Sequence, residues 1–111
     1  MPGKVILITS EFLGRGDDKL GLMLSANFLR LLGESEDKPA AIVFLNSGVR
    51  LVCEDSPVLE HVTRLEKQGV EILACTTCLE YFDLKEKQKT GKPTTMARTI
   101  QSMMNAETVC F

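Results

Sequence analysis

Short apolar segments alternate with amphipathic segments along this chain, and that alternation restricts the possible fold more than any other sequence feature. Residues 5–9, 40–45 and 70–74 are apolar with few interruptions, as is typical of strands covered on both faces. The segments between them have helical spacing, and this order predicts parallel strands joined by right-handed crossovers. We therefore expect an α/β fold with three layers, α/β/α, around a mostly parallel sheet of four or five strands, in one domain over residues 1–111.

Helical spacing of apolar residues predicts three helices. The first should end at Gly33, the second should begin at Ser56-Pro57 and run to Gln68, and the third should open at Thr94 or Thr95. The residues that set the spacing are Leu20, Met23, Leu24, Phe28 and Leu31 in the first helix, Val58, Leu59, Val62 and Leu65 in the second, and Met96, Ile100, Met103 and Met104 in the third. Residues 79–89 are expected to be irregular or to form a short helix, and residues 109–111 to add a short last strand.

The composition excludes several classes of protein. A net charge of −2 offers no basic face for a polyanion, so nucleic acid is not an expected partner. The apolar run at residues 5–8 is too short for the core of a signal peptide or for a membrane span, and we expect a cytoplasmic protein without membrane contact. In that reducing compartment the four cysteines are expected to remain thiols.

Three loops are expected to meet at one edge of the sheet. Residues 10–18, 46–55 and 75–78 each follow a predicted strand, and parallel sheets bind ligands at the carboxyl ends of their strands. Gly14-Arg15-Gly16 in the first loop suits an anion site at a helix start, and equally a capped turn. Asn46-Ser47-Gly48 in the second loop forms either an ordinary turn or part of a binding surface.

The third loop contains a CxxC thiol pair, Cys75-Thr76-Thr77-Cys78. The stretch Thr77-Cys78-Leu79-Glu80 has the form of a capping box, which would make Thr77 the N-cap and Cys78 the first helical residue. A helix start favours the thiolate, so Cys78 is expected to be the more acidic thiol. Sulfur chemistry, one half of a structural zinc site and two ordinary buried cysteines are the alternatives for this motif.

Neither a metal nor a cofactor is expected. A structural zinc ion needs four ligands, and the CxxC motif supplies two of them. The other candidates are predicted on separate elements, namely Cys53, Cys110 and His61. The sulfur chemistry considered for the thiol pair requires only a thiolate and an acceptor or donor of sulfur.

Three stretches of the chain together resemble a known family. They are Ile-Thr-Ser-Glu-Phe-Leu-Gly-Arg-Gly-Asp-Asp at residues 8–18, Phe-Leu-Asn-Ser-Gly-Val at residues 44–49 and Gly-Val-Glu-Ile-Leu-Ala-Cys-Thr-Thr-Cys-Leu at residues 69–79. In this order they resemble the DsrE/DsrF-like sulfur-relay family, and most closely its YedF-type branch of sulfurtransferase-like selenium metabolism proteins. The resemblance implies a DsrE/F-like fold and a persulfide carried on Cys75, whereas the capping argument favours Cys78.

The chain departs from the YedF-type pattern at three points. Residues 1–111 contain no TusA-like domain, with which such proteins typically begin. Thr76 stands where a glycine is common, and Asp83 stands where a glycine is expected after Tyr81-Phe82. We therefore expect the loop after the thiols to differ in geometry from the loop of the family.

The expected function is that of a sulfurtransferase-like carrier, and turnover as an enzyme is left open. Cys75 would accept sulfur, or its selenium analogue, as a persulfide, and Cys78 would be the assisting thiol. Backbone N–H groups of the 75–78 turn and the charge of Arg15 would stabilise the new anion. The expected substrate-binding residues are Arg15, Gly16, Asn46, Ser47, Gly48, Thr76 and Thr77. A non-catalytic binding or scaffold module and a thiol–disulfide redox protein are the alternatives.

The expected partners are sulfur donor and acceptor proteins, with a TusA-like protein as one candidate, and further copies of this chain. With 44% hydrophobic residues, the chain has more apolar side chains than one small sheet with its helices needs, and surplus apolar surface usually marks an interface. We expect a dimer, trimer or hexamer, and the resemblance implies trimers and larger assemblies with the cysteine loops near subunit boundaries. The candidate contact residues are Met96, Ile100, Met103, Met104, Tyr81 and Phe82.

Overall fold

Five parallel strands form the centre of the molecule in a computed structural model that describes residues 3–111. The sheet order is β4-β3-β2-β1-β5, and every neighbouring pair is parallel. The strands are β1 (Val5–Ile8), β2 (Ala41–Phe44), β3 (Glu71–Cys75), β4 (Lys92–Thr94) and β5 (Thr108–Cys110). The expected α/β class and the parallel sheet are confirmed.

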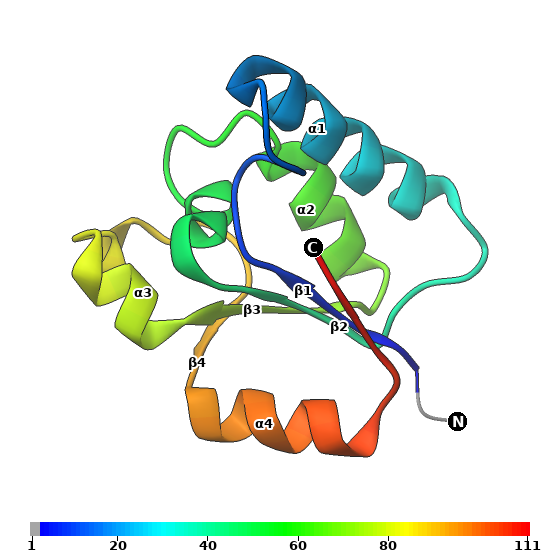
Figure 1. Cartoon of the computed structure of the whole chain (residues 1–111). Coiled ribbons are helices and arrows are strands. Elements are labelled where there is room, and N and C mark those ends of the chain that lie inside the picture. Colours follow the sequence, from blue (N-terminus) through cyan, green and yellow to red (C-terminus); the bar gives the residue numbers. More distant parts are fainter. Residues whose placement is uncertain (1–2) are drawn as a thin grey trace.

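Helices cover both faces of this sheet unequally. The α-helices are α1 (Asp18–Glu34), α2 (Leu59–Lys67), α3 (Thr76–Tyr81) and α4 (Met96–Asn105), and the 3₁₀ helices are η1 (Asn46–Val52) and η2 (Lys85–Lys87). Figure 1 shows α1 and α2 on one face, α4 on the other, and α3 beyond the end of β3. No helix within residues 3–111 combines the length and the apolar character that crossing a bilayer requires.

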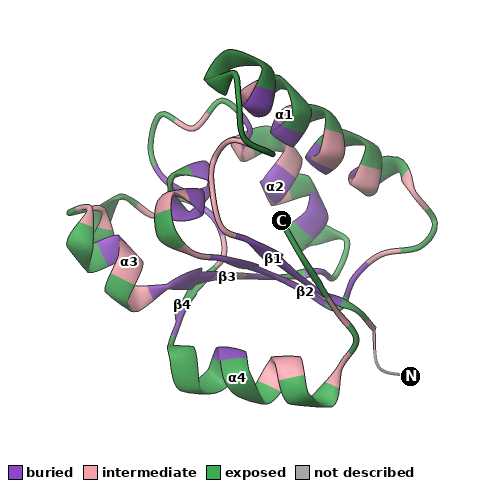
Figure 2. Ribbon diagram, in the orientation of Figure 1, coloured by how far each residue is buried: buried purple, intermediate pink, exposed green. Residues whose placement is uncertain are grey.

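The central strands form the core. β1 and β2 are buried along their whole length, and Ile42, Val43 and Phe44 have no exposed surface. In Figure 2 the purple of buried residues follows these strands and the inner sides of the helices. On the face below α1 and α2 the core is large, whereas the face below α4 has a small cluster of Val5, Leu7, Ala41 and Val43.

Three elements differ from the sequence expectation. β4 was not expected, because Lys92 and Pro93 are exposed at the edge of the sheet and produce no apolar pattern. Residues 46–52 form a 3₁₀ helix where a turn was expected. α2 begins at Leu59 rather than at Ser56-Pro57, because the Ser56 hydroxyl accepts from the Val58 N–H in a turn that precedes the helix.

Helix α1 carries four large apolar side chains on its outer face. The buried residues of α1 are Gly21, Ser25, Leu29 and Gly33. The outer face carries Leu20, Met23, Leu24 and Leu31, which are 51%, 57%, 40% and 52% exposed. Most of the apolar residues whose spacing predicts this helix therefore lie on the side that faces away from the sheet.

The loop after β1 explains why two inner positions of α1, Gly21 and Ser25, carry small residues. Gly21 accepts a backbone hydrogen bond from Leu13 (3.0 Å), and the Ser25 hydroxyl donates to the carbonyl of Glu11 (2.8 Å). A Cβ atom on Gly21 would lie 2.8 Å from the Cβ of Phe12, which is closer than side chains approach one another. Small residues therefore let the loop lie directly against the helix.

Two glycines of α1 provide a matched test of this close packing. We expect Gly21→Ala to lower the free energy of unfolding, because overpacking costs about 1–3 kcal/mol and exceeds the roughly 1 kcal/mol that alanine gains in a helix. Gly33→Ala should be neutral or stabilising, because its added Cβ would meet Arg64 at an ordinary 3.5 Å. Urea unfolding measures both, and equal stability of the two variants would contradict the packing argument.

Candidate functional site

The two thiols lie where β3 passes into α3. Cys75 is the last residue of β3 and the N-cap of α3, and its side chain is only 3% exposed. Cys78 lies in the first turn of α3 and is partly exposed, and both cysteines are free thiols. The expected capping box is wrong, because α3 already begins at Thr76 and has no side-chain cap.

Thr76 attaches the thiol helix to the sheet edge. Its hydroxyl donates to the carbonyl of Thr94 at 2.8 Å, next to the point where Cys75 pairs with Thr94 in the sheet. The Thr76 hydroxyl is thus committed to a structural contact, whereas Thr77 is exposed. Glu80, the expected capping partner of Thr77, forms an exposed ion pair with Lys85 at 3.4 Å.

A chain of hydrogen bonds joins the three loops that the sequence predicts at this edge. The Asn46 N–H donates to Sγ of Cys78 at 3.1 Å, and the Ser47 N–H donates to Oδ1 of Asn46 at 2.8 Å. The Glu11 N–H in turn donates to the Ser47 hydroxyl at 3.4 Å. The loop after β1, the start of η1 and the thiol helix are therefore connected through Asn46 and Ser47.

Asn46 and Gly48, both in η1, have special backbone requirements. Asn46 has a φ of 51°, in the left-handed region that asparagine tolerates better than most residues. A Cβ atom on Gly48 would lie 2.4 Å from the carbonyl oxygen of Ile8, so Gly48 lets η1 approach the end of β1. Gly48 is buried, and its contacts are those of a packing position.

The Gly14-Arg15-Gly16 stretch has the geometry of a capped turn. Both glycines have positive φ, 90° and 132°, and all three residues are exposed. The Asp17 side chain caps α1 by accepting from the Leu20 N–H at 2.8 Å. Arg15 takes part in none of the ion pairs formed within residues 3–111.

The acidity of Cys78 differs from the sequence expectation. Burial raises the pKa of the Cys78 thiol, the Asn46 N–H lowers this pKa, and the neighbouring Cys75 raises it further by a hydrogen bond and by its charge. The net direction is upward, whereas a helix start was expected to lower the pKa. The cause is the removal of the sulfur from water, which disfavours the charged thiolate.

A second contact, which was not expected from the sequence, crosses the same loops. Nε of Arg50 lies 3.7 Å from Oε2 of Glu11, and the Arg50 guanidinium lies 4.7 Å from the centre of the Phe82 ring at the end of α3. Arg50 also lowers the pKa of Cys53, although burial raises that pKa by more. The one available signal was the place of Arg50 in the loop after the second predicted strand.

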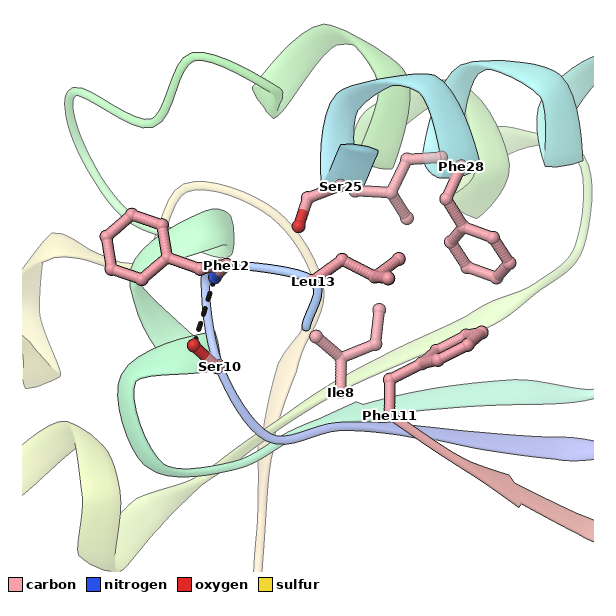
Figure 3. A pocket seen from close by; sticks show the side chains of 8 residues that line it. Ile8, Ser10, Phe12, Leu13, Ser25, Phe28 and Phe111 are labelled. Atoms are coloured by element: carbon pink, nitrogen blue, oxygen red, sulfur yellow. Dashed lines mark hydrogen bonds between the residues drawn. The ribbon is translucent and has the colours of Figure 1, made fainter. Parts of the chain in front are cut away.

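Two of the hollows in the molecule border the loop after β1. The first, of about 180 Å³, is lined by Glu11, Arg50, Cys53 and Leu84 among others. The second, drawn in Figure 3, lies between the loop after β1, α1 and Phe111, and it is apolar apart from Ser10 and Ser25. Its volume of about 10 Å³ has room for no more than one water, so it is a packing gap.

No group of three or more His, Cys, Asp or Glu side chains within residues 3–111 is arranged to hold a metal ion. The groups found at the thiols are instead a pair of free cysteines and a backbone N–H donor, and an arginine–aromatic contact lies at the end of the same helix. This set suits chemistry that takes place on sulfur itself.

The fold and the site together define a parallel α/β domain with a thiol pair at the carboxyl edge of its sheet. The sequence model of the DsrE/DsrF-like family matches residues 4–110, and the chain belongs to that family. The match does not distinguish the YedF-type branch. No curated protein matches this chain closely enough to count as a relative.

Three solved structures have the same fold. The ychN protein from E. coli matches with a TM-score of 0.77, 17% identity and 100% of each chain covered. MTH1491 from Methanobacterium thermoautotrophicum matches with a TM-score of 0.73 and 18% identity, and 100% of each chain is covered. BT1422 from Bacteroides thetaiotaomicron matches with a TM-score of 0.65 and 14% identity, over 98% of this chain and 95% of the other. MTH1491 and BT1422 are described as proteins of unknown function, and at this identity the likeness shows the fold alone.

The pH dependence of Cys78 alkylation tests the electrostatics of the thiol pair. Because burial and Cys75 raise the pKa of Cys78, its reaction with iodoacetamide should reach half its maximal rate above the ordinary thiol pKa of about 8.5. Cys75→Ala should move this midpoint to lower pH, because both contributions of Cys75 are upward. Peptide mass spectrometry in a Cys110→Ser background, which removes the exposed thiol, measures both, and a wild-type midpoint below about 8 would contradict the burial argument.

Proposed function

We propose that this chain is a sulfur-relay protein that holds sulfane sulfur on the Cys75–Cys78 pair. The observation that carries the proposal is the pair itself: two free thiols, three positions apart at the carboxyl edge of the sheet, one of which accepts the Asn46 N–H. Membership of the DsrE/DsrF-like family supports it. Sulfur is the substrate proposed, with selenium as its chemical analogue.

The proposed reaction is an exchange at sulfur. A cysteine thiolate attacks the terminal sulfur of a donor persulfide, the sulfur–sulfur bond of the donor breaks, and the donor leaves as a thiolate. The sulfur atom is then bound to the cysteine as a new persulfide. If the thiolate of Cys78 attacks Sγ of a Cys75 persulfide, the products are a Cys75–Cys78 disulfide and hydrosulfide.

Cys75 is proposed as the carrier and Cys78 as the assisting thiol. The resemblance favours Cys75, and its burial would shield a persulfide from water and from other thiols. Cys78 is the more exposed of the two, so a donor approaches the pair from the side of Cys78. The reverse assignment, in which Cys78 receives the sulfur, is the alternative that the next experiment separates.

Single substitutions distinguish the two thiols. We expect Cys75→Ser to abolish sulfur uptake, whereas Cys78→Ser should still form the adduct with an altered lifetime. Intact-protein mass spectrometry after incubation with glutathione persulfide, in a Cys110→Ser background, measures a gain of one sulfur atom. Loss of uptake only in Cys78→Ser would reverse the roles, and uptake by neither parent nor variant would overturn the carrier.

The same mass measurement separates the other two functions. Reversible loss of two hydrogens without added sulfur would indicate a thiol–disulfide redox protein. No change in mass would indicate a binding or scaffold module that uses the same edge.

The remaining sequence candidates have supporting parts in this proposal. Asn46 would act through its backbone N–H and Ser47 by holding the Asn46 loop, whereas Gly48 and Thr76 would act by packing and by attaching α3. Arg15, beside Gly16, and Thr77 are exposed and would meet an anionic donor as it approaches. The proposed partners are donor and acceptor proteins, including a TusA-like protein, in the reducing cytoplasm, where free thiols persist.

Self-association is proposed through two apolar faces. The outer face of α1 carries Leu20, Met23, Leu24 and Leu31, and the outer face of α4 carries Met96, Ile100 and Met104, which are 51%, 49% and 77% exposed. These faces lie on opposite sides of the sheet (Figure 1). Of the other expected contact residues, Tyr81 is 83% exposed, whereas Met103 and Phe82 are partly buried. Exposed apolar side chains grouped on one helix face often mark a surface that another protein chain covers.

A charge placed on either face should weaken the assembly. We expect Leu24→Lys on α1 and Met104→Lys on α4 each to lower the mass measured by light scattering at ~100 μM, where standard interfaces are saturated. Lys67→Glu, a charge change at an exposed residue of α2, is the control and should leave the mass unchanged. A monomeric wild-type protein at this concentration would exclude the proposed assembly.

A further inference from the structure

The position of Cys78 depends on a short helix with few attachments of its own. α3 has six residues and no side-chain cap, and Leu79 is its one buried residue. Its outer side chains Thr77, Glu80 and Tyr81 are exposed. Contacts from other segments must therefore hold α3 in place.

Two links join α3 to the loop after β1, and both begin at Glu11. The first runs through the backbone, from the Glu11 N–H to Ser47, Asn46 and Sγ of Cys78. The second runs through side chains, from the Glu11 carboxylate to Arg50 at 3.7 Å and from Arg50 to the Phe82 ring at 4.7 Å. The first link ends at the thiol, and the second ends at the residue that follows the helix.

Arginine suits the middle of the second link for a physical reason. Its planar guanidinium can stack on an aromatic ring and pair with a carboxylate at the same time, whereas a lysine ammonium lacks the planar surface. The Arg50 and Glu11 side chains are 47% and 25% exposed, and an ion pair with that much solvent contact contributes little to global stability. We therefore expect the link to affect the position of α3 more than the free energy of unfolding.

We propose that Arg50 is a positioning residue for the thiol pair. Arg50 holds the end of α3 against the loop after β1, and this keeps Sγ of Cys78 within reach of the Asn46 N–H. This role of Arg50 rests on the proposed sulfur-relay function, in which the two thiols are the reacting groups. No hydrogen bond or ion pair formed within residues 3–111 joins Arg50 to Cys78, so the proposed effect of Arg50 runs through the position of α3.

Four variants separate geometry from charge. Arg50→Met removes the stacking and the charge, Arg50→Lys keeps the charge without the planar surface, and Phe82→Leu removes the ring and keeps Arg50. Arg98→Met, at an exposed residue of α4, is the control. Each is made in the Cys110→Ser background, and iodoacetamide alkylation of Cys78 is followed against pH by peptide mass spectrometry.

We expect the first three variants to shift the rate of Cys78 alkylation at pH 8 about threefold to tenfold from that of the parent, because a displaced α3 changes both the Asn46 hydrogen bond and the burial of the sulfur. The midpoint of the pH profile should move away from that of the parent, and the urea midpoint of the two Arg50 variants should change little. Arg98→Met should match the parent. Parent-like alkylation in Arg50→Met, or in Arg50→Lys and Phe82→Leu together, would overturn the proposal.

The alkylation readout is independent of sulfur transfer. If the parent takes up no sulfur from glutathione persulfide and the Arg50 and Phe82 variants still shift the pH profile, the relay function fails and the positioning role of Arg50 stands. If the parent takes up sulfur and the profiles do not shift, the relay function stands and the positioning role fails.

Discussion

The approach of η1 to the end of β1 is the constraint on which the site depends. The Leu45 N–H donates to the carbonyl of Ile8 at 2.9 Å, and Gly48 lies so close to that carbonyl that a Cβ would meet it at 2.4 Å. Asn46 lies between these two contacts with a left-handed backbone. The direction of its N–H toward Cys78 thus follows from how closely a 3₁₀ helix can pack on a strand end.

Much of the fold could be predicted from the sequence because buried parallel strands have a strong pattern. The strands at residues 5–8, 41–44 and 71–75 were predicted as residues 5–9, 40–45 and 70–74 from their mainly apolar character, and their order predicted which loops meet at the carboxyl edge. β4 was not identifiable, since an edge strand with Lys92 and Pro93 needs no apolar face. The inner face of α1 was also hidden, because Gly21 and Ser25 pack closely without contributing to an apolar pattern.

The thiol pair was predictable as a motif, but its electrostatics was not. A capping box at Thr77 and Glu80 satisfies the local pattern, yet Cys75 becomes the N-cap because Thr76 is bonded to β4. Burial then decides the direction of the Cys78 pKa, and burial is a tertiary property. Arg50 likewise contacts Glu11, which lies 39 positions earlier in the chain, and Phe82, which lies 32 positions later. No local sequence pattern reveals contacts over such separations.

The burial of Cys75 has a kinetic consequence. A side chain that is 3% exposed meets a reagent only when the surrounding segments open, and short helices held by few contacts open more often than the core of a domain. Access to the inner sulfur is then governed by the frequency of local unfolding around α3, which in proteins takes roughly microseconds to seconds, and not by diffusion of the reagent. Temperature and denaturant would alter that access well before they unfold the sheet.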